Sequence, residues 1–83
     1  MASVSTPIRI FDEIAELIAS GPDRETLLEF RPSIETQERA GELLARLKNE
    51  TLTEEEREEL DDFVRAESFV QLVKARLRRR ADG

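Results

Sequence analysis

The densest group of titratable side chains is an acidic run at residues 54–62, which holds seven carboxylates and one arginine. Paired carboxylates can bind a divalent metal ion or act as general acid and base. Helical di-metal proteins normally combine Glu with His, and this chain has no His. The run also lacks the turn glycine of a calcium loop. We expect no metal or cofactor here. We interpret the run as a solvated first helical turn, or alternatively as an acidic partner surface.

A basic cluster lies near the end of the sequence, and its members are Lys74, Arg76, Arg78, Arg79 and Arg80. Residues 74–83 carry five basic and one acidic group, for a charge of +4, whereas residues 1–73 carry eight basic and eighteen acidic groups, for −10. Such a cluster complements a helix dipole, attracts an acidic protein surface or contacts nucleic-acid phosphates. No aromatic residue is interleaved to stack on bases. The first interpretation is a complement to the helix dipole that also aids solubility. Docking on an acidic surface, of a partner or of the chain itself, stays open and is preferred to binding of nucleic acid.

Nucleophilic catalysis lacks its usual residues. The absence of Cys and His excludes a thiolate zinc site, a disulfide framework, a cysteine nucleophile and a histidine base. Serines paired with Lys48 or Lys74 have no informative spacing, and three scattered glycines form no phosphate-binding loop. We therefore predict no catalytic residue and a protein that is not an enzyme.

An apolar stripe at helical spacing runs through Leu60, Phe63, Val64, Phe69, Val70, Val73 and Leu77. It is either an intramolecular core or an interface, and periodicity does not separate the two. The other predicted helices are too short to cover all of it, and exposed apolar patches often mark interaction sites. The predicted partner-binding residues are Phe63, Phe69, Val70, Val73 and Leu77 as anchors, with Arg76, Arg78, Arg79 and Arg80 for electrostatic steering.

Three helices are predicted to position these residues. The first spans about 7–19, with Thr6 as cap and Gly21 as its left-handed end. The second spans about 34–48, capped by Ser33 and ended by Asn49, with Gly41 weakening it or marking a close helix contact. The third spans about 54–80.

The third helix starts at a capping box formed by Thr53 and Glu56. The short loop before it favours an antiparallel hairpin of the last two helices. Residues 26–30 are predicted to form either one or two helical turns or none.

Composition agrees with an all-α class: of 83 residues, 39% are charged and only four are aromatic, all Phe. The length predicts one small domain over 1–83, with flexible ends at 1–5 and 81–83. No apolar stretch approaches 18 residues, and no signal peptide is visible. We expect a cytoplasmic protein.

Several segments together resemble a group of short, uncharacterised bacterial helical proteins. They are Phe30-Arg31-Pro32-Ser33, Gln37-Glu38-Arg39, Leu52-Thr53 with Glu55-Glu56, and Val73-Lys74-Ala75-Arg76. The resemblance covers about residues 27–80. Those proteins are encoded beside a partner gene, in some cases an HNH-type nuclease, in an antitoxin-like pairing. The resemblance implies partner binding and no catalytic residue.

The sequence thus predicts a non-enzymatic accessory or antitoxin-like subunit that docks a protein partner, or associates with itself, through its long C-terminal helix. The alternative hypothesis is a small dimeric regulator that binds nucleic acid through the arginine cluster.

Overall fold

The computed structural model describes residues 9–82, with side chains described as far as Arg80. Its helices are α1 (Ile10–Ala19), α2 (Arg24–Glu29), α3 (Ile34–Lys48) and α4 (Glu54–Asp82). Residues 9–82 contain no strand, which confirms the all-α class. None of these helices combines the length and the apolar character needed to cross a membrane. Of the predicted flexible ends, residues 1–5 and 83 lie outside the described part, and α4 continues to Asp82.

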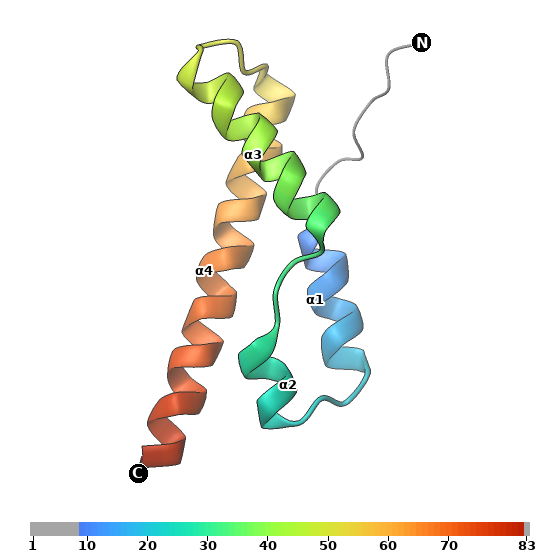
Figure 1. Ribbon diagram of the computed structural model, residues 1–83, viewed down its shortest axis with the longest axis vertical. Coiled ribbons are helices and arrows are strands. Elements are labelled where there is room, and N and C mark those ends of the chain that lie inside the picture. The colour runs from blue at the N-terminus through green and yellow to red at the C-terminus, as the bar shows by residue number, and fades with distance from the viewer. Residues whose placement is uncertain (1–8, 83) are drawn as a thin grey trace.

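The long helix α4 is the axis of the molecule (Figure 1). α3 crosses its first half, and α1 and α2 lie beside its second half. Buried Ala40, Leu43 and Leu60 lie on α3 and the first half of α4. A cluster of Ile10, Ile14, Ala66 and Val70 joins α1 to α4, with Phe30 and Phe63 packed against it.

The helix starts follow local capping chemistry. Ser33 caps α3 by accepting a hydrogen bond from the Thr36 N–H at 3.2 Å. Thr53 and Glu56 form the reciprocal bonds of the predicted capping box, at 3.0 and 3.1 Å. Both predictions are confirmed.

The start of α1 differs from the prediction. Arg9 lies outside the helix, and its carbonyl accepts the first helical bond from the Glu13 N–H, so α1 begins at Ile10. The predicted start, Pro7, and the predicted cap, Thr6, lie outside the described residues. The sequence did not decide whether residues 26–30 form helical turns, and the structure places residues 26–29 in α2. The Asp23 side chain caps it by accepting from the Thr26 N–H at 2.9 Å.

The end of α3 corrects two predictions. The left-handed residue is Glu50, with φ of 58°, whereas Asn49 keeps φ of −89°. The Thr51 N–H bonds to the Arg46 carbonyl, and the Glu50 N–H bonds to that of Leu47, which is the Schellman pattern. This pattern requires the left-handed conformation one position beyond Asn49. Gly41 marks no helix contact, because no atom of another described helix lies within 4 Å of a Cβ placed there.

Candidate functional site

The inward face of α4 holds most of the predicted apolar anchors. Val70 is only 8% exposed and lies in the core, so it is not available to a partner. Phe63 packs against the same core. Val73 is half-buried and borders a narrow apolar cavity of about 40 Å³ beneath α1 and α2. Leu77 is half-buried as well. The short helices α1 and α2 therefore cover more of the stripe than their lengths predict.

In its described part, α4 exposes three large apolar side chains, Val64, Phe69 and Leu72, and the last two lie on one side of the helix. Phe69 is 46% exposed and Leu72 is 49% exposed. They are three residues apart, so they lie on one side of the helix. Of the predicted apolar anchors, Phe69 is the one that the structure leaves open to solvent. Leu72 is a surface residue that the sequence analysis missed.

The signal for Leu72 was present in two adjacent apolar pairs, Phe69-Val70 and Leu72-Val73. Neighbouring residues on a helix point about 100° apart, so one member of each pair must turn away from a narrow core stripe. Periodicity alone did not say which member of each pair faces the core. The packing of α1 against Val70 decides it.

The basic cluster divides into structural and free members. The Lys74 ammonium donates to the Phe30 carbonyl at the end of α2, at 2.8 Å. Arg24 of α2 donates to the Leu77 carbonyl at 3.4 Å. These two contacts attach α2 to α4, and Lys74 is therefore a structural member of the basic cluster.

The four predicted steering arginines, Arg76, Arg78, Arg79 and Arg80, are exposed. None of them bonds to another described side chain. At about 100° per residue, Arg76, Arg79 and Arg80 share the side of Phe69 and Leu72, whereas Arg78 points away from it. Arg78 borders a separate open groove of about 740 Å³ between α3, α4 and residues 28–32.

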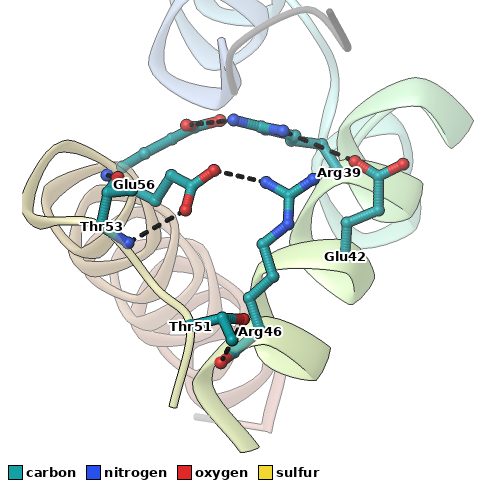
Figure 2. A network of polar contacts seen from close by, with 7 residues as sticks. Arg39, Glu42, Arg46, Thr51, Thr53 and Glu56 are labelled. Atoms are coloured by element: carbon teal, nitrogen blue, oxygen red, sulfur yellow. Dashed lines mark hydrogen bonds and ion pairs between the residues drawn. The ribbon is translucent and has the colours of Figure 1, made fainter. Parts of the chain in front are cut away.

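Part of the acidic run forms contacts between α4 and α3 (Figure 2). Arg39 forms a two-pronged ion pair with Glu59, at 2.7 and 2.9 Å, and both side chains are largely buried. These hydrogen bonds raise the pKa of Arg39 against the opposing effect of burial. Arg46 pairs with Glu56, whose pKa is lowered first of all by the bond from the Thr53 N–H. Among residues 9–82, no carboxylates gather in a group able to hold a metal ion.

The rest of the acidic run faces solvent. Glu58, Asp61 and Asp62 line a shallow hollow of about 310 Å³ together with Arg65. Asp62 pairs with Arg65 at 3.4 Å, and both side chains are mostly exposed. An exposed pair of this kind contributes little to stability, so these carboxylates are not required for the fold.

Glu13 joins α1 to the start of α3. Its carboxylate accepts from the Thr36 hydroxyl at 2.6 Å, the Ser33 N–H at 2.7 Å and the Ser33 hydroxyl at 2.9 Å. Burial raises the pKa of Glu13, but these three bonds outweigh burial and bring the pKa below its ordinary value. The contact is structural, because it completes the cap of α3.

Comparisons of the chain with family models, curated proteins and solved structures find no match.

The candidate functional surface that we select is the outward face of α4, where exposed apolar and charged side chains lie on one side of one helix. It combines Phe69 and Leu72 with the cations at its C-terminal end and the exposed carboxylates at its N-terminal end. We call this set the outer face of α4. Its members are Glu58, Asp61, Asp62, Arg65, Phe69, Leu72, Arg76, Arg79 and Arg80. Its two apolar residues lie at the centre, with charged residues on both sides of them along the helix.

Proposed function

We propose that this protein is a cytoplasmic, non-enzymatic binding subunit, of the accessory or antitoxin-like kind, that docks a protein through the outer face of α4. One observation carries the proposal: Phe69 and Leu72 are about half exposed side by side, on the same side of α4 as three exposed arginines. The arginines beside them, unpaired within the described part, favour an acidic rim on the partner.

The antiparallel hairpin of α3 and α4 is part of the proposal, because it holds α4 rigid. Two ion pairs support it. Arg39, early in α3, pairs with Glu59, and Arg46, late in α3, pairs with the earlier Glu56. This reversed order is the one that antiparallel helices produce. A rigid α4 presents Phe69 and Leu72 with little loss of conformational entropy on binding.

The resemblance to small proteins encoded beside a partner gene suggests the first partner to test. The product of the neighbouring gene, an HNH-type nuclease in some of those pairs, would be co-expressed with the tagged chain. We expect the two to co-purify, and we expect Leu72→Asp to lose the partner while the circular dichroism of the variant stays helical.

Val64→Asp is the matched control. Val64 is 53% exposed on the same helix, but it lies eight residues before Leu72, about 12 Å along the axis and about 80° around it. The control should keep the partner. Equal retention by both variants would exclude the outer face as the docking surface.

The alternative hypothesis of nucleic-acid binding has less structural support. Lys74 is bonded to Phe30, and Arg78 points away from the other arginines, so the cations form no continuous track for a phosphate backbone. Duplex or single-stranded binding that falls steeply with salt, and disappears in a variant lacking the four arginines, would favour this alternative instead.

A further inference from the structure

The outer face of α4 has an ordered charge pattern. Reading from its N-terminal end, the face shows three carboxylates, then Arg65, then the apolar pair Phe69 and Leu72, and finally three arginines. All of these side chains are exposed. The helix therefore has an acidic end and a basic end on one face, with apolar groups between them.

This pattern is complementary to itself when the helix is reversed. The midpoint of Phe69 and Leu72 lies nine residues after the centre of Asp61-Asp62 and nine residues before the centre of Arg79-Arg80. At 1.5 Å per residue, both charged pairs are about 13 Å from the midpoint. A two-fold axis through the midpoint places Asp61-Asp62 of one copy opposite Arg79-Arg80 of the other.

We infer that the outer face of α4 binds a second copy of this chain, in an antiparallel, two-fold symmetric pair. Phe69 of each copy packs on Leu72 of the other, and two charge clusters close the ends. An isologous contact of this kind uses the same patch on both subunits, which a self-complementary surface requires.

One contact in this arrangement is unfavourable. Arg65 lies opposite Arg76 of the second copy, and both carry positive charge. Asp62 lies beside Arg65 at 3.4 Å and offsets part of the repulsion. Because only two large apolar side chains per copy are covered, the pair is expected to be weak and dependent on protein concentration.

The inference rests on the proposed function, since both assign protein binding to the outer face. It goes further by naming the occupant. A different protein and a second copy would use the same residues, so their binding is expected to be mutually exclusive. Addition of the co-expressed partner should then convert the self-associated form into a complex with one copy of the chain.

The first measurement is the mass of the isolated chain by light scattering coupled to size exclusion, from about 5 µM to about 1 mM. We expect the mass to rise from 9.5 kDa towards twice that value across this range. We also expect a lower mass at high salt, because exposed charge pairs are screened. A constant 9.5 kDa at all concentrations would overturn the inference.

A charge-swap experiment tests the antiparallel geometry. The double variant Asp61→Arg with Asp62→Arg makes the outer face basic at both ends. The double variant Arg79→Glu with Arg80→Glu makes it acidic at both ends. Each variant alone should lose self-association. A mixture of the two should form a one-to-one pair, because both end contacts then join opposite charges. Failure of the mixture to pair would exclude this arrangement.

A matched control changes the same number of charges away from the outer face. Lys48 of α3 and Arg78 of α4 are exposed and lie off that face, so Lys48→Glu with Arg78→Glu should still self-associate as the unmodified chain does. The outcomes also separate the two proposals. A monomeric chain that still loses its partner on Leu72→Asp refutes only the pair. A self-associating chain that binds no partner refutes only the accessory role.

Discussion

Two residues of this fold end a helix with a left-handed backbone. Gly21, with φ of 67°, follows α1, and Glu50, with φ of 58°, follows α3. Glycine adopts this conformation freely, whereas an L-residue with a side chain pays roughly 1–2 kcal/mol for it. The sequence identified the first position from glycine itself. It missed the second, because Glu carries no signal for left-handed backbone and the neighbouring Asn49 carries a stronger one.

Substitutions at Glu50 and at Gly21 should change the free energy of unfolding in opposite directions. Glu50→Gly should raise the free energy of unfolding by about 0.5–1 kcal/mol, because the relief of the left-handed strain exceeds the extra freedom of glycine in the unfolded chain. Gly21→Ala should lower it by about 1 kcal/mol, and this cost is conformational because nothing lies within 4 Å of the added Cβ. Urea unfolding followed by circular dichroism measures both changes. A loss of stability in Glu50→Gly would contradict the strain argument.

At the scale of elements, the sequence predicted well wherever a helix end is determined by neighbouring residues. The bounds 34–48 and the start at Glu54 agree with α3 and α4, because Ser33 and the Thr53–Glu56 box satisfy the first N–H groups locally. Contacts between elements were not predictable in this way. Glu13 is twenty residues from Ser33, and Lys74 is forty-four residues from Phe30. No pattern of neighbouring residues therefore predicts either hydrogen bond.

The bond between α1 and α3 through Glu13 predicts a pH dependence. The pKa of Glu13 is lowered in the folded chain from an ordinary value of 4.5. The contribution of Glu13 to the free energy of unfolding is therefore fully present above its pKa in the unfolded chain. It is lost as the pH falls through its lower pKa in the folded chain. Glu13→Gln should lower the free energy of unfolding by about 1 kcal/mol at pH 7. The difference from the unmodified chain should shrink as the pH falls below 4.5.

Thermal unfolding of the two proteins at a series of pH values measures this difference. Glu16→Gln is the control on the same helix, because Glu16 is exposed and its side chain makes no bond in the described part. It should leave stability nearly unchanged at every pH. A gap between Glu13→Gln and the unmodified chain that stays constant down to pH about 2 would show that the carboxylate charge has no part in the contact.

At the scale of the whole molecule, α4 serves two purposes on opposite sides. Its inward side is the surface on which α1, α2 and α3 assemble, and its outward side is exposed. The sequence showed one broad apolar stripe, left open whether it is a core or an interface, and named residues of both sides as candidate partner anchors. Only the placement of α1 separates Val70, in the core, from Phe69, at the surface. Among the described residues, no other helix covers Phe69 and Leu72 on the outward side.

Adjacent substitutions on α4 should therefore behave very differently. Val70→Asp places a carboxylate among Ile10, Ile14 and Ala66, where its desolvation costs about 3 kcal/mol or more. That is a large part of the roughly 4–12 kcal/mol available to a chain of this length. Phe69→Asp changes an exposed side chain and should cost less than about 1 kcal/mol. Far-UV circular dichroism with thermal melts should show Val70→Asp unfolded or strongly destabilised and Phe69→Asp close to the unmodified chain. Equal stability losses in the two variants would mean that Phe69 also lies in a core, and the outer face could not then be a docking surface.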